Sequence, residues 1–389
     1  MATAYYRGSG IEADDEGQSI GEKVLQLPWG IILLVIALTG VGVAMLYSAA
    51  NGNMEPWASR HIGRFALGFV IMIGAALVDL RFWLRIAYPF YFVSFALLVS
   101  VEVMGQVGMG AQRWINLGFF NFQPSEMMKV AVVLALARYF HVPTLEDVFR
   151  IRTLVIPVLL IVAPVVLVMN QPDLGTAGML LLVGAAIFFV VGVRWWKFAL
   201  VLGAGVATVP IAWQFLRDYQ KNRILTFFNP ESDPLGSGYH ILQSKIALGS
   251  GGLFGKGFLQ GTQSHLNFLP EMQTDFIFTM LAEEFGLIGG VGLIMLFLLL
   301  VAYGVVIALR CRNHFGRILA LGLTANLYFY VFINTAMVMG LIPVVGVPLP
   351  LVSYGGTVML TIMFSLGLIM CVYIHRDTRI SRRAPGAQL

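Results

Sequence analysis

The sequence predicts an all-α, polytopic membrane protein with about ten transmembrane helices. Hydrophobic residues make up 58% of the 389 residues and charged residues only 12%, which is about half the charged share of a soluble domain. Runs of roughly 20 apolar residues, the length that a helix needs to cross about 30 Å of hydrocarbon, recur along the chain. The short alternating segments of a transmembrane β-barrel do not occur in the sequence.

Ten segments fit spanning helices, and together they form one membrane domain over residues 28–375. An N-terminal tail (1–27) and a basic C-terminal tail (376–389) flank this domain. The N-terminal tail is rich in carboxylates, unlike the basic start of a secretory signal, and is predicted to be a disordered cytoplasmic leader. The predicted spans are 28–48, 62–79, 85–104, 123–141, 153–170, 174–193, 196–216, 286–309, 316–340 and 355–374.

Basic residues indicate how the spans are oriented. The short loops on one face hold little more than Arg60, Arg64 and Arg113, whereas most other short-loop arginines fall on the face that both termini share. The positive-inside rule therefore predicts cytoplasmic termini. Residues 217–285, between the seventh and eighth spans, form a large mixed-charge segment on the outer face. Such a segment indicates that the protein works on that face.

Several function classes lack support in the sequence. Cys311 and Cys371 have no CxxC spacing, so neither a disulfide framework nor a zinc site is expected, and both are interpreted as packing residues. The histidines are scattered, with no HExxH, and no GxSxG or nucleic-acid-binding patch is present. No inverted repeat is visible, which disfavours a secondary transporter.

The outer segment carries three candidate anion-binding cations. Arg223 lies near its start, and Lys256 is surrounded by six glycines between 249 and 261. Lys245 lies in an amphipathic stretch that predicts a helix lying in the membrane interface or re-entering it. Glycine lets backbone N–H groups approach an anion closely, and lysine adds a point charge. From this stretch alone, a flexible loop is the favoured interpretation, and an anion-binding loop is the alternative.

A second constellation is "QRWINLGFFNFQPSEMMK". Arg113 and Trp114 suit the membrane interface. Glu126 and Lys129 are three residues apart, so they share a helix face and can pair. Two readings stay open here. The pair is a structural ion pair, or Lys129 or Arg113 meets a phosphate in a cavity.

Two further motifs mark irregular backbone. In "NQPDLGTAG", Asp173 is interpreted as a helix cap. The stretch "GLIPVVGVPLPLVSYGG" has three prolines and four glycines, so it is not regular helix. Non-helical backbone at membrane depth must be buried in protein or line a cavity. Ser353 and Tyr354 are its main polar side chains.

The stretch "LPEMQTDFIFTMLAEEFG" leads four carboxylates into the eighth span. Pro270 predicts a helix start, which would place Glu271 and Asp275 on one helix face. Asp275 precedes the apolar "FIFTML" and is a candidate to take a proton from a hydroxyl. Glu271, Glu283 and Glu284 are interpreted as charges that cap the helix or lie at the interface.

Four motifs in order carry a family resemblance: "RWI…QPSEMMK", "QPDLGTA", "LPEMQTDFIF…AEEFGLIGG" and "PLPLVSYGG". Over about residues 28 to 375 the chain resembles the SEDS (shape, elongation, division and sporulation) family. "GLIPVVGVPLPLVSYGG" looks more like its elongation branch, RodA, than its division branch, FtsW. The resemblance implies a ten-helix peptidoglycan glycosyltransferase of the bacterial cytoplasmic (inner) membrane. It would polymerise lipid II on the outer face for cell elongation and rod shape.

The resemblance also implies site residues. The family's essential aspartate matches Asp275, its arginine-tryptophan pair matches Arg113 and Trp114, and its acidic and basic pair matches Glu126 and Lys129. With the residues reached above, the expected substrate-binding set is Arg113, Trp114, Glu126, Lys129, Arg223, Lys245, Lys256, Glu271, Ser353 and Tyr354.

The same resemblance implies protein partners, while a cation and an alternative function stay open. It implies a class B penicillin-binding protein with one spanning helix and other elongation-complex proteins, and nothing points to nucleic acid. A divalent cation (Mg or Mn) that bridges Asp275 or Glu271 to pyrophosphate stays open, although no ligand spacing demands one. The rival interpretation is a lipid II flippase, because both functions need a polar groove in a helical bundle.

Overall fold

A bundle of long helices makes up most of the computed structural model, which describes residues 20–104, 106–108, 111–116, 121–171, 173–215, 218–229, 237–266, 271–378 and 380. Eight helices are long and apolar enough to cross a membrane. They are α2 (Trp29–Ala49), α3 (Ala58–Leu77), α4 (Leu80–Met104), α7 (Ile151–Asn170), α8 (Leu174–Val191), α13 (Ile277–Arg310), α14 (His314–Val338) and α15 (Gly356–Ile374). The chain is therefore a multi-pass helical membrane protein, as predicted.

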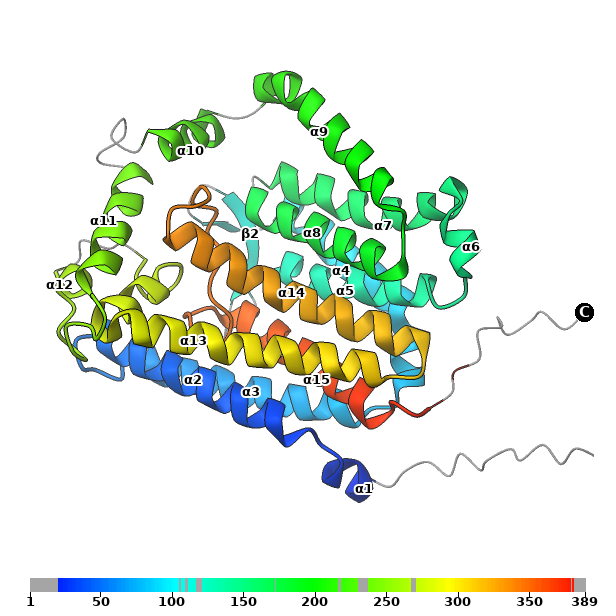
Figure 1. The fold of residues 1–389 in the computed structure, drawn as a ribbon, viewed down its shortest axis with the longest axis horizontal. Coiled ribbons are helices and arrows are strands. Elements are labelled where there is room, and N and C mark those ends of the chain that lie inside the picture. Colours follow the sequence, from blue (N-terminus) through cyan, green and yellow to red (C-terminus); the bar gives the residue numbers. More distant parts are fainter. Residues whose placement is uncertain are drawn as a thin grey trace, which may run out of the picture.

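The two other predicted spans are also helices, but each departs from a simple lipid-facing span. The helix α5 (Pro124–Tyr139) packs against α4, α7, α8, α14 and α15. Nearly all its side chains are buried, so protein and not lipid surrounds Glu126 and Lys129. The helix α9 (Trp195–Phe215) stands apart from the bundle in Figure 1, and its apolar stretch is only Trp195–Thr208. Most of its side chains between 199 and 208 are exposed, as lipid contact would require.

The two ends of the bundle differ in character. The helices α10 (Asp218–Phe228), α11 (Ser237–Ser250) and α12 (Thr262–His265) gather at one end, and the chain leaves α15 at the other (Figure 1). The short helix α1 (Ile20–Leu25), which lies within the tail predicted to be disordered, also belongs to that other end. There its Lys23 ammonium donates to Leu77 O at the end of α3 (3.1 Å). Both described ends of the chain thus lie on one side, as an even number of spans requires.

The remaining elements are small. Between α4 and α5, three short strands that the sequence did not predict form an antiparallel sheet in the order β1-β2-β3. They are β1 (Gln106–Gly108), β2 (Ala111–Asn116) and β3 (Asn121–Phe122). The helix α6 (Leu145–Val148) has a capping box built by Thr144 and Asp147. Cys311 and Cys371 are free and buried, as expected of packing residues.

The eighth span is a broken helix, and the glycine loop (residues 249–261) fills the break. The helix α13 begins nine residues before the predicted span and is interrupted at Gly286 (φ 67°, ψ −162°). The N–H of Leu287 donates to Gly252 O (2.9 Å), and the N–H groups of Lys256 and Gly257 donate to the carbonyls of Glu283 and Glu284 (both 3.0 Å). The loop therefore satisfies backbone groups that the break would leave unpaired. Its N–H groups at 256 and 257 face helix carbonyls and not an anion.

The close approach of this loop predicts a stability effect. Gly255 has φ +81°, and a Cβ atom there would lie 2.1 Å from Glu284 O. We expect Gly255→Ala to destabilise the fold by at least about 1–3 kcal/mol, the cost of a non-glycine residue in this backbone region, with the clash in addition. The measurement is thermal unfolding in detergent. Gly249→Ala is the matched control, because a Cβ there meets nothing within 4 Å. Equal midpoints for the two variants would contradict the prediction.

Candidate functional site

Asp275 lies where three parts of the fold meet: the turn 271–276, the buried end of α14, and the proline loop (residues 340–355). The turn replaces the helix start that the sequence predicted, and α13 begins only at Ile277. Glu271 has φ +53°, and its carbonyl accepts from the N–H of Thr274 (3.0 Å). Glu271 and Asp275 therefore do not share a helix face, which corrects that expectation; Pro270 lies outside the described residues.

Three consecutive residues of the turn are tied to the proline loop or α14. Gln273 O accepts from the N–H of Tyr354 (2.8 Å), and Thr274 O accepts from the hydroxyl of Ser353 (2.6 Å). The fully buried Asn334 amide donates to Asp275 O (2.9 Å) and to Val347 O (2.7 Å). These bonds fix the backbone of Asp275 and hold its position relative to the helices.

The Asp275 side chain is partly exposed. Gly346 (φ +71°) passes beside it, and a Cβ atom at that position would lie 3.4 Å from Asp275 Oδ2. A carboxylate on a fixed backbone with partial access to the outside is a suitable proton acceptor. Glu271 instead shapes the turn, because its Oε2 accepts from the Thr274 hydroxyl (3.0 Å) and the Gln273 amide (3.3 Å).

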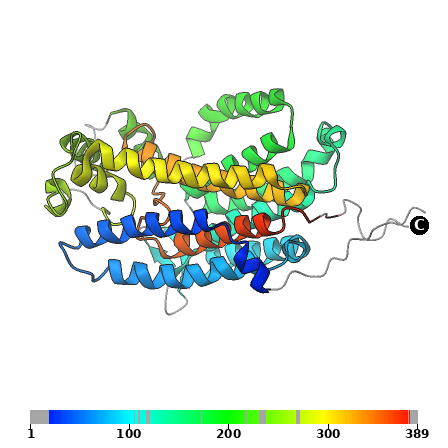
Figure 2. The ribbon, with the colours of Figure 1, turned by 60° about the horizontal axis from the view of Figure 1, so that its bottom comes forward.

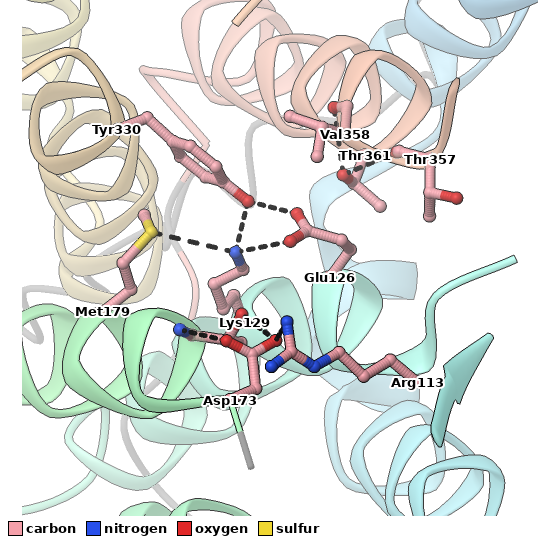
Figure 3. Close-up of polar contacts among 10 residues, drawn as sticks. Arg113, Glu126, Lys129, Asp173, Met179, Tyr330, Thr357, Val358 and Thr361 are labelled. Atoms are coloured by element: carbon pink, nitrogen blue, oxygen red, sulfur yellow. Dashed lines mark hydrogen bonds and ion pairs between the residues drawn. The ribbon is translucent and has the colours of Figure 1, made fainter. Parts of the chain in front are cut away.

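Glu126 and Lys129 of α5 form a closed polar cluster with Tyr330 of α14 (Figure 3). Lys129 Nζ donates to Glu126 Oε1 (2.8 Å) and to the Tyr330 hydroxyl, which in turn donates to Glu126 Oε2. Met179 Sδ lies 3.9 Å from the same ammonium. Lys129 is only 1% exposed and Glu126 only 4%. This geometry favours the structural reading of the pair, because each charge is neutralised and enclosed.

Arg113 and Asp173 form a second ion pair beside this cluster (Figure 3). Arg113 Nη1 lies 3.7 Å from Asp173 Oδ2, and Arg113 Nε donates to Gln171 O (3.4 Å). Asp173 also accepts from the Thr176 N–H (3.1 Å) at the start of α8, which confirms its predicted role as a cap. Trp114, next to Arg113 on β2, is partly buried.

Lys256 is held within the fold. Its ammonium lies 2.7 Å from Glu283 Oε1 and donates to the Thr262 hydroxyl (2.7 Å). Glu283 is fully buried, and Glu284, which accepts a hydrogen bond from Ser48 of α2, is 1% exposed. The prediction that these two glutamates cap the helix or lie at the interface is therefore wrong. A buried carboxylate needs a partner, and Lys256 is that partner for Glu283.

Two candidate cations of the outer segment lie elsewhere. Arg223 belongs to α10, and its side chain lies outside the described part of the structure. Lys245 on α11 is exposed and extends over Gly340 at the end of α14. The helix α11, expected to lie in the interface or to re-enter the membrane, packs on α13 and α14. There Ser244 bonds the Thr279 hydroxyl (2.9 Å) and Val338 O (2.8 Å).

The proline loop residues Ser353 and Tyr354 meet the expectation that this backbone is buried or lines a cavity. Ser353 is buried, and its oxygen accepts from the Leu349 N–H (2.8 Å). Tyr354 is partly exposed, and its hydroxyl accepts from Arg64 of α3 (3.1 Å). Within the described residues, no group of three metal-ligating side chains occurs.

Sequence reasoning missed three residues of this region: Asn334, Tyr330 and Arg64. Asn334 and Tyr330 lie within a spanning helix, and an uncharged polar group there is a weaker signal than a charge. Arg64 was noted only for its charge. None of the three has a local sequence partner, so their contacts depend on the tertiary fold.

Comparison with known proteins identifies the family. Residues 28–378 match the family model FTSW_RODA_SPOVE, described as "Cell cycle protein". The chain is 45% identical over 352 residues to "Peptidoglycan glycosyltransferase MrdB" of Escherichia coli K12, covering 89% of this chain and 93% of MrdB. It is 37% identical over 355 residues to a "Probable peptidoglycan glycosyltransferase FtsW" of Trichlorobacter lovleyi, covering 87% of this chain and 91% of that protein.

Solved structures agree. A chain from a study of "polymerization and crosslinking by a peptidoglycan synthase complex" aligns with a TM-score of 0.79 at 32% identity, covering 91% of this chain and 99% of that one. The "Rod shape determining protein RodA" of Thermus thermophilus aligns with a TM-score of 0.69 at 30% identity, covering 91% and 98%. With its ordered motifs, its helical bundle and these matches, the chain belongs to the SEDS family of FtsW, RodA and SpoVE proteins and is of the RodA type.

Proposed function

We propose that this protein is a peptidoglycan glycosyltransferase that polymerises lipid II into glycan strands for cell elongation. The observation that carries the proposal is Asp275, whose carboxylate is partly exposed while its backbone is fixed by Asn334 and by the neighbouring bonds to the proline loop. A sugar hydroxyl is hardly acidic, so its attack needs a positioned base. The 45% identity to MrdB supports the same reaction class.

In the proposed reaction, Asp275 takes the proton of the acceptor's GlcNAc 4-hydroxyl. The hydroxyl oxygen forms a bond to the anomeric carbon of the donor MurNAc, and the bond from that carbon to the pyrophosphate oxygen breaks. The electron pair leaves with undecaprenyl pyrophosphate, whose charge needs nearby cations. A single displacement inverts the carbon and forms a β-1,4 link. Holding the base on a fixed backbone contributes by placing it before the reaction begins.

The orientation and partners belong to the same proposal. The start of α13, which follows Asp275, lies with α10 to α12 and the proline loop at the end of the bundle opposite the described chain ends (Figure 1 and Figure 2). Cytoplasmic termini would therefore put the site on the outer face of the bacterial inner membrane. The partner would be a class B penicillin-binding protein with one spanning helix, together with other elongation-complex proteins. The outer ends of α13 and α14 are the proposed contact.

The test is a gel assay with purified protein and fluorescent lipid II in detergent, with and without a class B penicillin-binding protein. We expect ladders of glycan strands from the wild-type protein. In parallel, the protein is reconstituted in liposomes, and the transfer of lipid II across the bilayer is measured. Lipid II transfer without ladders under any condition would overturn the proposal and favour the flippase.

A further inference from the structure

A pyrophosphate leaving group needs a cation near Asp275, and most of the cations predicted from the sequence are already engaged. Lys129, Arg113 and Lys256 each face a buried carboxylate, of Glu126, Asp173 and Glu283 respectively. A phosphate that recruited one of these cations would leave the carboxylate uncompensated, which is costly in a buried setting. A cation outside these pairs is better suited to the substrate.

Arg64, near the start of α3, is such a cation. Its guanidinium carbon lies 4.3 Å from the ring centroid of Tyr354, and Nη2 donates to the Tyr354 hydroxyl (3.1 Å). Within the described residues, no carboxylate forms an ion pair with Arg64. The side chain is partly exposed, and it borders Gly356, where a Cβ atom would lie 3.2 Å from Arg64 Nε.

Arg64 is connected through Tyr354 to the turn 271–276, which carries Asp275. The N–H of Tyr354 donates to Gln273 O, two residues before Asp275, and the adjacent Ser353 bonds Thr274 O. A guanidinium has five N–H donors in a planar fork that matches phosphate oxygens. Tyr354 takes up one of the five and, through the contact with its ring, restricts where the rest can point.

We infer that Arg64 binds the pyrophosphate of the lipid-linked sugar donor and that Tyr354 orients its guanidinium. This inference rests on the proposed function. Lys245, on α11, is the rival cation. It lies over Gly340 at the end of α14, and none of its described contacts reaches the turn 271–276. An arginine stacked on a ring is better pre-organised for a phosphate than a lysine on a flexible stem.

The first measurement is polymerisation kinetics over a range of lipid II concentrations for the wild type, Arg64→Gln, Arg64→Lys and Arg60→Gln. We expect Arg64→Gln to raise KM by about 10- to 100-fold, as loss of a charge-assisted contact predicts. Arg64→Lys should lie in between, because it keeps the charge without the fork. Arg60 is the matched control, one turn away on α3 and 62% exposed, with only a distant partner in Glu55 (4.0 Å).

The second measurement separates binding from a structural role. Farnesyl pyrophosphate should raise the thermal midpoint of the wild type and of Arg60→Gln. It should raise the thermal midpoint of Arg64→Gln much less. Farnesol, which lacks the pyrophosphate, should not distinguish the proteins. A fall in kcat with unchanged KM, or equal stabilisation of the wild type and Arg64→Gln, would overturn the inference. Absence of ladders from the wild type would instead overturn the proposed function.

Discussion

Asp275→Asn is expected to abolish polymerisation while the protein stays folded. Asparagine has nearly the same shape but cannot accept the proton, and a positioned general base contributes about 10²- to 10⁴-fold to a rate. The Asn334 amide bonds the backbone carbonyl of residue 275, so the substitution leaves this bond in place. The measurement is the initial rate of glycan synthesis from fluorescent lipid II, beside the thermal midpoint in detergent.

Two controls make this result specific. Asp147→Asn changes an exposed carboxylate on α6, outside the site, and should leave the rate unchanged. Lipid II binding by Asp275→Asn should stay close to that of the wild type, because a base acts on the acceptor hydroxyl during the reaction. Wild-type-like glycan synthesis by Asp275→Asn would remove Asp275 from the proposed mechanism.

The spans were predictable because hydrocarbon imposes one strong constraint, a helix of sufficient apolar length. Each predicted span contains a helix, and the span edges differ by a few residues except at α13. There the predicted boundary, 286, coincides with Gly286, the break in the helix. The apolar run begins at the break, so hydropathy found the longer part of α13 and missed the turns before it.

The glycine loop shows what local sequence could not predict. Its six glycines suit an anion and suit close backbone packing equally well, because both need the same absence of a side chain. Close backbone packing is what the fold shows, because the carbonyls of Glu283 and Glu284 accept hydrogen bonds from the loop, roughly 27 residues away in sequence. The role of Lys256 was also not predictable from local sequence, because its partner Glu283 is brought beside it only by the fold.

Asp275 was found because it precedes an apolar run at a helix start, and the family resemblance points to the same residue. What holds it was not foreseeable, because Asn334 is 59 residues away and the proline loop follows still later. The expectation that the proline loop must be buried or line a cavity was correct, since that follows from unpaired backbone groups at membrane depth. The contact between the proline loop and the turn 271–276 was not predicted, because it depends on the tertiary fold.

Lys129→Met is expected to be the most destabilising of the substitutions considered. It leaves the Glu126 carboxylate buried at 4% exposure without its ammonium partner. Removing one member of a buried ion pair typically costs about 3–5 kcal/mol. The measurement is unfolding of the purified protein in detergent by a titration with a denaturing detergent. A variant as stable as the wild type would show that Glu126 does not depend on Lys129.

The double variant Glu126→Gln/Lys129→Met separates the two readings of this pair. It removes both charges, keeps similar volumes and leaves an amide to bond the Tyr330 hydroxyl, so most of the lost stability should return. The folded double variant can then be assayed with lipid II. Polymerisation at a rate near that of the wild type would mean that the pair serves to join α5 to α14. A folded but inactive protein would mean that at least one of the two charged groups takes part in the reaction, because stability would no longer account for the loss.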